Sequence, residues 1–421
     1  MKVKKFYYPE PKSIAKCLEH MGIDVRFNTR RNCGEMRLPN SDWEPVTKRL
    51  SYWVLEEMRV NYYDARTETD ANPKRLKLSH ADWVRSINYI YREAECDPFK
   101  EWLEGLPAWD RKPRIDGWMQ SAGFILGDDA PAELMAWAQR YVLLGSVART
   151  YRPGMKLDVS PVLSSTKGGL GKSMVLRLLF EDSEVHDVFF TDGLVFSNDQ
   201  KRMLEALLGR VIVEMSEMAG ILRVDSDGLK GFLSRQNDNA IRLAWREDAE
   251  HLPRRCVFVG TCDTGAPLPD DPNLRRFVVM PIVDSDVPGI VKWMDTNRSQ
   301  LWAEALHRYK QGESPVFPSH LDEQRDELND QYRHSSPWEP RVALWLEDND
   351  TSMGFSLSDV AYGIDLIKSN EGAGRISNKD REDLAKALRR HGFQNRRITV
   401  GNSRIRRWLT VENLEAIQSA E

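Results

Sequence analysis

The feature that most constrains the fold is a glycine-rich loop between an apolar run and an amphipathic helix pattern. The apolar run covers residues 159–163, and Met174 opens the helix pattern that follows the loop. A strand, a glycine-rich turn and a helix in this order are typical of a phosphate-binding loop in an α/β domain. The loop residues are Thr166, Lys167, Gly168, Gly169, Leu170, Gly171, Lys172 and Ser173.

Each part of this loop has a chemical use in holding ATP and Mg²⁺. Small residues allow backbone N–H groups to converge on phosphate oxygens, and the helix N-terminus adds positive potential. Lys172 is then expected to reach the β- and γ-phosphates, and Ser173 to bind Mg²⁺. Thr166 replaces the first glycine of the pattern G-x-x-x-x-G-K-[ST]. The alternative is a glycine-rich turn with an incidental lysine, which the flanking strand and helix patterns make less favoured.

Further apolar runs at 188–190, 211–213 and 256–260 predict a doubly wound α/β domain. Glu214 and Glu217 follow the second of these runs, where an acidic strand end would hold the metal and orient the attacking water. The sequence does not assign the two roles between them.

Polar residues also follow the third apolar run, where Thr261 and Asp263 could sense the nucleotide. Arg275 and Arg276 precede one more apolar run, and arginine is suited to stabilising the charge of phosphoryl transfer. The alternative for this arginine pair is surface solvation or a local salt bridge.

Composition excludes several classes of protein. Lys and Arg total 60 against 64 Asp and Glu, so the net charge of −4 gives no overall attraction to nucleic acid, and any such binding must use local patches. The five cysteines contain no C-x-x-C pair, which indicates reduced thiols rather than disulfides or a zinc module. No run approaches the roughly 18 apolar residues of a membrane span, so we expect a cytoplasmic protein without a membrane partner.

Six segments, read together with these motifs, resemble the virulence-associated protein E family of phage-like and mobile elements. The resemblance covers most of the chain. The segments are PFKEWLEGLPAWDRKPRID, RPGMK before the loop, VIVEMSEM, FLSRQND, PRRCVFVGT and LRRF.

The resemblance implies an AAA+ ATPase related to superfamily 3 helicases. Such a motor forms a ring, expected to be a hexamer, that moves along single-stranded DNA with ATP at subunit boundaries. Asp263 stands where the family usually carries Asn in a G-T-x-N sensor, and a carboxylate near the γ-phosphate would repel it unless the carboxylate is paired. The implied roles are nucleotide and magnesium binding for Lys172 and Ser173, hydrolysis for Glu214 and Glu217, and a finger into the neighbouring subunit for Arg275 and Arg276.

Two segments are candidate DNA contacts. In superfamily 3 motors the interval between the acidic and sensor strands lines the pore; here it carries Arg242, Trp245 and Arg246, followed by Arg254 and Arg255. A solvated hairpin with a packed tryptophan is an equally good interpretation. The second segment, near the C-terminus, predicts a helix and a two-stranded wing that would contact duplex origin DNA, or dock a partner protein. Its candidate contacts are Arg389, Arg390, Arg396, Arg397, Arg404 and Arg406.

The predicted fold is therefore an α/β, superfamily 3-like AAA+ ATPase with mostly helical N-terminal domains and a C-terminal winged-helix module. We expect an accessory domain at 1–95 (small α/β or mainly helical), a helical pre-ATPase domain at 96–155, the ATPase at 156–312, a helical linker at 313–337 and the winged helix at 338–421.

The favoured function is an ATP-dependent DNA helicase replicating a phage or mobile element in a bacterial host. A nucleotide-gated DNA-binding initiator or regulator is the alternative, and a small-molecule P-loop kinase has less support. No primase or nuclease signature is present, so primer synthesis would need a separate primase.

Overall fold

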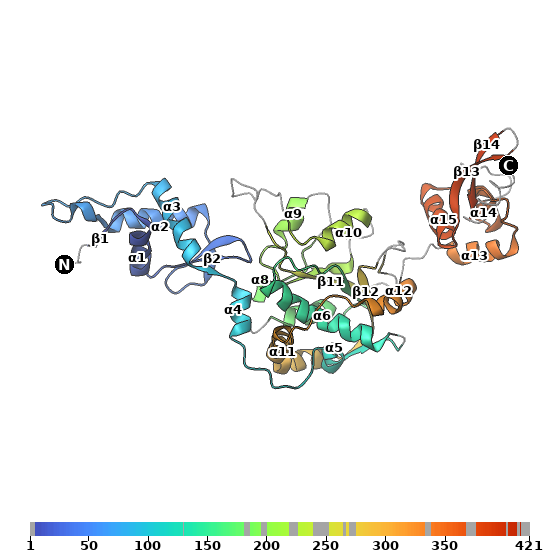
Figure 1. The fold of residues 1–421 in the computed structure, drawn as a ribbon, viewed down its shortest axis with the longest axis horizontal. Helices are drawn as coiled ribbons and strands as arrows, with labels where there is room; N and C mark the ends of the chain where they lie inside the picture. Colours follow the sequence, from blue (N-terminus) through green and yellow to red (C-terminus); the bar gives the residue numbers. More distant parts are fainter. Residues whose placement is uncertain are drawn as a thin grey trace. The chain divides into compact units, whose positions relative to one another are not determined.

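The computed structural model divides the chain into two compact units, Met1–Thr264 with Arg275–Leu328, and Gly265–Leu274 with Asn329–Glu421. Each is described by itself, and Figure 1 traces the order of the elements. Within them the structure describes residues 5–128, 130–180, 186–194, 200–218, 226–238, 252–263, 267–268, 275–332, 338–367, 376–400, 403–410 and 413.

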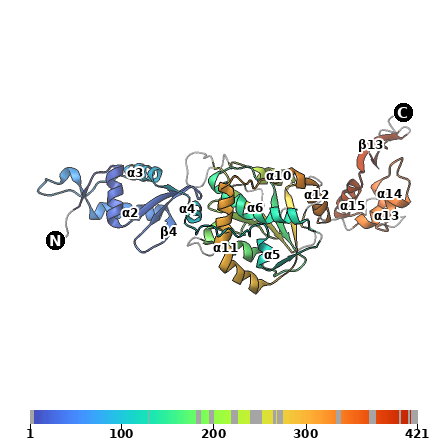
Figure 2. The ribbon, with the colours of Figure 1, turned by 60° about the horizontal axis from the view of Figure 1, so that its bottom comes forward.

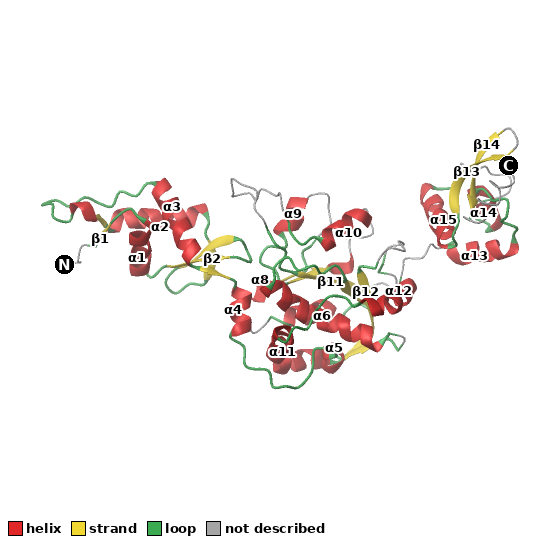
Figure 3. Cartoon of the chain, in the orientation of Figure 1, coloured by secondary structure: helices red, strands yellow, loops and turns green. Residues whose placement is uncertain are grey.

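The N-terminal module combines three helices with a small sheet, so the α/β interpretation of this region describes it better than the mainly helical one (Figure 3). Its sheet has the order β4-β3-β2-β6, and a second pairing joins β1 to β5 in parallel. Ile14, Met36, Val54 and Trp83 are buried between these elements. The elements are β1 (Phe6–Tyr7), α1 (Pro11–Met21), β2 (Asp24–Asn28), β3 (Cys33–Arg37), β4 (Trp43–Pro45), α2 (Lys48–Asn61), β5 (Tyr63–Asp64), η1 (Ala65–Thr67), α3 (His80–Glu93) and β6 (Glu95–Cys96).

A six-stranded sheet forms the centre of the first unit, in the order β7-β12-β8-β11-β10-β9. Strand β7 is antiparallel to β12, and the other neighbours are parallel. Every residue of β8, β10 and β11 is buried, as expected for parallel strands covered on both faces. The strands are β7 (Phe124–Leu126), β8 (Ser160–Ser164), β9 (Phe190–Thr191), β10 (Ile212–Met215), β11 (Val257–Cys262) and β12 (Phe277–Ser285).

Helix α6 is buried almost all round because it packs against β8, β11 and β12 on one side and α11 on the other. The two helices run beside the sheet (Figure 2). This unit contains α4 (Pro98–Glu104), α5 (Trp118–Ala122), α6 (Ala132–Tyr151), α7 (Lys172–Leu178), α8 (His186–Phe189), α9 (Gln200–Glu205), η2 (Ser216–Met218), α10 (Ser226–Ser234), α11 (Val287–Lys310) and η4 (Ser319–Leu321), before α12 (Asp322–Gln331).

One predicted strand is wrong in most of its length. Residues 188 and 189 belong to α8, and the strand begins only at Phe190. A short apolar run carries no periodicity that distinguishes a buried helical turn from a strand. The other three predicted runs correspond to β8, β10 and β11, with shifted ends.

The C-terminal unit packs three helices against a two-stranded hairpin. Val342, Val360, Leu384 and Trp408 lie in its core. Strands β13 and β14 are antiparallel, with Arg397 opposite Arg406. Its elements are α13 (Glu339–Asp348), α14 (Leu357–Gly363), α15 (Asn378–Arg390), β13 (Gln394–Val400) and β14 (Ser403–Leu409). In the described part of the chain, no helix has the length and apolar character needed to cross a bilayer.

Candidate nucleotide site and arginine clusters

Three parallel strands bring the candidate nucleotide residues to one edge of the sheet. In the register of β8, β11 and β10, Leu163 lies opposite Thr261, and Glu214 lies opposite Val259. All three strands therefore end at the same edge, where the glycine-rich loop leaves β8. Crevices beyond the carboxyl ends of such strands are the usual ligand sites of α/β sheets.

The loop has the backbone conformations for which its glycines are needed. Gly169 and Gly171 have φ values of 77° and 79°, which L-residues with a side chain rarely adopt. A Cβ atom on Gly168 would come within 3.1 Å of an Asp263 carboxylate oxygen. Ser165 stabilises the turn, because its hydroxyl donates to the carbonyl of Lys167 at 2.6 Å. Thr166, Lys167, Gly168 and Gly169 are exposed, and Leu170 is buried.

Lys172 is buried at the start of α7, and its ammonium group points back toward the loop. It donates to Ser165 Oγ at 2.6 Å and forms an ion pair with Asp263. The Asp263 side chain is 37% exposed, whereas that of Lys172 is 6% exposed. Lys172 is therefore the ion-pair partner of Asp263, the carboxylate that we expected near the γ-phosphate.

Glu214 lies at the centre of the same edge and is fully buried. The Ser173 hydroxyl donates to Glu214 Oε1 at 2.6 Å, and Thr261 Oγ1 donates to the same oxygen at 2.5 Å. Burial raises the pKa of Glu214, and these two hydrogen bonds act in the opposite direction. The second oxygen, Oε2, is buried and has no hydrogen-bond partner among the described residues.

These residues fit Mg²⁺. A hard cation takes oxygen ligands, and Mg²⁺ is usually held by one or two protein groups together with substrate phosphates. The hydroxyl of Ser173 and the unpartnered Oε2 of Glu214 offer such oxygens. Within the described ranges, no cluster of three or more His, Cys, Asp or Glu side chains is arranged to hold a metal by itself.

The remaining predicted site residues do not join this group within one chain. The Glu217 backbone lies in η2, but its side chain is outside the described residues. Arg275 and Arg276 precede β12, at the amino end of a strand parallel to β8, and therefore at the opposite edge of the sheet from the loop. Arg275 is exposed, and Arg276 lies 3.4 Å from an oxygen of Asp158.

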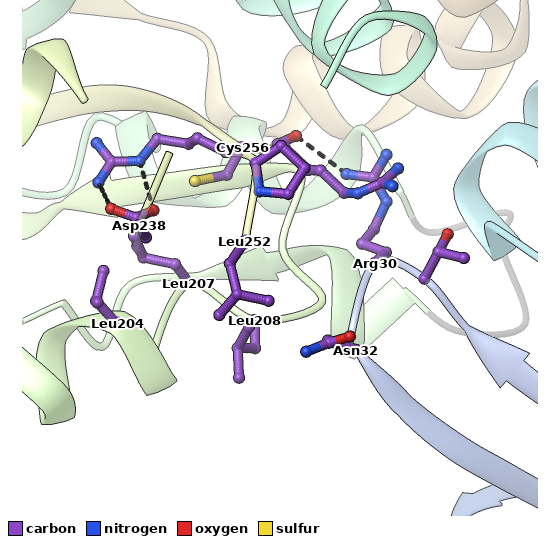
Figure 4. Close-up of a pocket in the computed structure, with 12 residues that line it drawn as sticks. Arg30, Asn32, Leu204, Leu207, Leu208, Asp238, Leu252 and Cys256 are labelled. Carbon is purple, nitrogen blue, oxygen red and sulfur yellow. Dashed lines mark hydrogen bonds and ion pairs between the residues drawn. The ribbon is translucent and has the colours of Figure 1, made fainter. Parts of the chain in front are cut away.

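The structure describes only some of the residues of the central unit that were grouped as possible DNA contacts. Arg242, Trp245 and Arg246 lie outside the described residues. The grouping of Arg254 with an exposed DNA-binding cluster is wrong, because Arg254 is only 2% exposed. It forms an ion pair with Asp238, at 2.5 Å and 3.0 Å to the two oxygens (Figure 4).

Arg255 also has an internal partner, Asp97 Oδ2 at 3.0 Å. That carboxylate is shared with Arg30 of the N-terminal module, whose Nε and Nη2 lie 2.9 Å and 3.1 Å from its two oxygens. Arg30 donates further to Thr150 Oγ1 and to the carbonyls of Arg210 and Arg255, at the amino ends of β10 and β11. Figure 4 draws Arg30 and Cys256 among the residues that line one pocket at this junction.

Sequence reasoning missed this arginine, because nothing local to Arg30 indicates partners so far along the chain. Asp97 before Pro98 does carry a local signal, that of a helix N-cap. It accepts from the backbone N–H groups of Phe99 and Lys100.

In the C-terminal unit, the arginines divide by partner. Arg407 bonds to Asp359 at 3.1 Å, and Arg396 bonds to Gln394 at 2.5 Å. Arg397 and Arg406 are exposed and directly opposite each other, and neither forms an ion pair within the described residues. Like charges in this arrangement disfavour a hairpin, so an anionic ligand would relieve them. Arg389 is exposed, and the side chains of Arg390 and Arg404 lie outside the described residues.

The sheet and its carboxyl edge define a mixed α/β protein with a lysine, a serine and a buried acid gathered around a glycine-rich loop. Residues 103–334, more than half of the chain, match the family model of the virulence-associated protein E-like domain. The chain belongs to this family, as the sequence motifs predicted.

The chain is also similar to solved structures of the NrS-1 C-terminal region. An A-form apo structure is 15% identical with a TM-score of 0.45, covering 95% of this chain and 99% of the other. A second apo structure is 13% identical with the same TM-score and coverage. A search of curated proteins finds no match.

Proposed function

We propose that this protein is an ATP-dependent DNA helicase of a phage or mobile element, a superfamily 3-like AAA+ motor that moves on single-stranded DNA during replication. The observation that carries the proposal is the group formed by Lys172, Ser173, Glu214, Thr261 and Asp263 at one edge of the sheet. Membership of the virulence-associated protein E-like family supports it.

The residues of this edge suit the hydrolysis of ATP. The Gly168–Ser173 backbone would hold the phosphates, while Lys172 exchanges Asp263 for a phosphate oxygen. Mg²⁺ at this edge would supply positive charge against the charge of the phosphates. Glu214 and Ser173 would hold that ion, and Thr261 would keep the carboxylate oriented through its hydrogen bond. Glu217 remains a candidate for orienting the attacking water.

The position of Arg275 and Arg276 favours a role in a neighbouring subunit. Because they lie at the edge opposite the loop, neither is suited to reach a phosphate held by its own chain. A ring, expected to be a hexamer, would bring them to the next subunit's site, where arginine can stabilise transferred charge.

DNA contacts are proposed at two places. Arg242, Trp245 and Arg246 would grip single-stranded DNA in the ring. Helix α15 with the β13–β14 hairpin would act as a winged helix on duplex origin DNA, with Arg397 and Arg406 at its exposed face. Primer synthesis is assigned to a separate primase.

A nucleotide-gated initiator with weak hydrolysis is the second candidate. The pairing of Asp263 with Lys172 favours it, since this contact competes with the nucleotide for the lysine. Steady-state ATPase with and without single-stranded DNA separates the two candidates. The helicase predicts turnover stimulated by DNA, and the initiator predicts nucleotide binding without it.

Lys172→Ala should abolish ATP hydrolysis while the fold is retained, because the only buried cation described at this edge is removed. Lys167→Ala is the matched control, since this lysine is exposed in the same loop. Equal loss in both variants would point to damage of the loop itself.

Mixing tests the shared site. Subunits with Arg275→Ala or Arg276→Ala should regain hydrolysis when combined with Lys172→Ala subunits, whose fingers are intact. Absence of any complementation would contradict a site shared between subunits.

A further inference from the structure

The N-terminal helices hold an aromatic surface that the proposed motor does not use. Tyr52 and Trp53, neighbours on α2, are 52% and 47% exposed. The His80 ring, at the first residue of α3, stacks on Tyr52 with centroids 5.4 Å apart and an interplanar angle of 25°. The same helix α2 buries Val54, Leu55 and Met58 on its other face, so the fold does not need these two rings.

Their exposure is unusual for this chain. Every large aromatic side chain that is strongly exposed in the described residues precedes residue 90: Tyr8, Tyr52, Trp53 and Tyr89. Among the described residues, the central and C-terminal regions bury their tryptophans and phenylalanines, or leave them only partly accessible. Within the described part of the chain, two adjacent exposed rings therefore occur in this module alone.

Exposed cations lie on α2 and on the segment that leads into α3. Arg49 lies one turn before them on the exposed side of α2, and Arg75 and Lys77 are exposed on the segment leading into α3. That segment borders an open hollow of about 520 Å³, lined by Arg59, Arg75, Leu76, Lys77, Leu78, Ser79 and Asp82.

The negative charge of this hollow is already engaged. Its one lining carboxylate, Asp82, accepts from the Ser79 hydroxyl at 2.6 Å and lies 3.8 Å from Arg85. Arg49 and Lys77, by contrast, form no ion pair within the described residues. This surface therefore carries two cations, Arg49 and Lys77, that no ion pair in the described residues neutralises.

We propose that this α2–α3 surface binds single-stranded nucleic acid. Bases would stack on Tyr52 and Trp53, and Arg49 and Lys77 would contact the phosphates. Aromatic platforms beside a basic groove are how proteins hold single strands without reading sequence. Arg49, one turn from both rings, forms no ion pair within the described residues, which favours an anionic occupant over an apolar protein surface. None of these residues belongs to the nucleotide edge of the central sheet.

The test uses the full chain without nucleotide and a fluorescein-labelled oligothymidylate. Tyr52→Ala with Trp53→Ala should weaken binding about tenfold or more, because each stacked base contributes about 1–3 kcal/mol. Tyr89→Ala is the matched control, an exposed aromatic on α3 away from the stacked pair, and should bind like wild type. Lys77→Ala should lower the slope of log affinity against log salt by about 0.7.

Crosslinking makes the result specific to this surface even if other segments hold DNA. A bromodeoxyuridine oligonucleotide should crosslink to the peptide containing Tyr52 and Trp53. Oligouridylate in parallel shows whether RNA is held equally well. Unchanged affinity of the double variant, or crosslinks confined to other peptides, would overturn the proposal. So would a change in oligomeric mass with affinity unchanged, which would make the surface a protein interface. The helicase proposal is tested separately, by measuring ATP hydrolysis with and without single-stranded DNA.

Discussion

Two groups of arginines that look alike in the sequence have opposite roles in the structure. Arg254 and Arg30 are buried, and each meets a carboxylate with two nitrogens. Arg397 and Arg406 are exposed, oppose each other across a hairpin and have no carboxylate in the described residues. An arginine run therefore indicates an anion, but only the fold decides whether that anion is internal or a ligand.

The physical difference is the cost of removing a charge from water. A buried guanidinium needs a carboxylate and filled hydrogen bonds, so it becomes part of the scaffold. An exposed guanidinium keeps its hydration and can exchange water for phosphate. The two groups should respond differently to substitution.

The largest effect is expected on stability, from substitution of a buried arginine. Arg254→Met should lower the free energy of unfolding by about 3–5 kcal/mol, because it leaves the buried Asp238 carboxylate without its partner. Chemical denaturation measures this, with Arg397→Met as the exposed control that should change little. A small loss for Arg254→Met would remove the distinction between the two groups.

Next in size is the loss of duplex binding at the hairpin. Arg397→Glu with Arg406→Glu should weaken binding about a hundredfold, because two phosphate contacts become repulsive. The stability of the double variant should be unchanged. Fluorescence anisotropy measures the binding of duplex DNA, and thermal unfolding measures the stability. Arg407→Ala is the control, since Arg407 already bonds to Asp359. Undiminished binding of the double variant would contradict the wing assignment.

The Lys172–Asp263 pair stands between the two extremes, with one buried and one partly exposed partner. Asp263→Asn should lower the KM for ATP a few-fold, since the neutral amide competes less for the lysine and repels phosphate less. Initial-rate kinetics test this. A fall in kcat with KM unchanged would show instead that the carboxylate acts in hydrolysis.

The smallest effect is a pH dependence of the Arg30–Asp97 pair. Burial raises the pKa of Asp97, but Arg30 and Arg255 outweigh it, so the net pKa is lowered. Such a carboxylate stabilises the fold above its unfolded pKa of about 3.9, and this contribution is lost as pH falls through the lower folded value. Arg30→Met should therefore differ most from wild type near neutral pH and less in acid. A difference independent of pH in equilibrium unfolding would argue against an ionic contribution.

Sequence reasoning succeeded where the signal is local. The glycine-rich loop, the strands beside it and the β13–β14 hairpin each depend on residues close together in the chain, and the structure has elements there with shifted ends. It failed for Arg254 and Arg255, because the acids that pair with them, Asp238 and Asp97, lie 16 and 158 residues away. The apolar run at residues 188–190 was also too short for its periodicity to distinguish a helical turn from a strand.

The candidate site shows the same division. Lys172, Ser173 and Glu214 could be selected from motif spacing, whereas the hydrogen bonds that Ser173 and Thr261 share on one oxygen of Glu214 depend on the order of the strands. The contact between Asp263 and Lys172 likewise requires β11 to lie next to β8.

The guanidinium of Arg30 has a practical consequence for anyone shortening this protein. A truncation starting at residue 96 would delete β2 and strip two backbone carbonyls, those of Arg210 and Arg255, of their donor. It would also leave the helix-capping carboxylate of Asp97 with Arg255 as its single described cation. The N-terminal module therefore contributes hydrogen bonds and an ion pair to the central α/β region, and the central region should be prepared with this module in place.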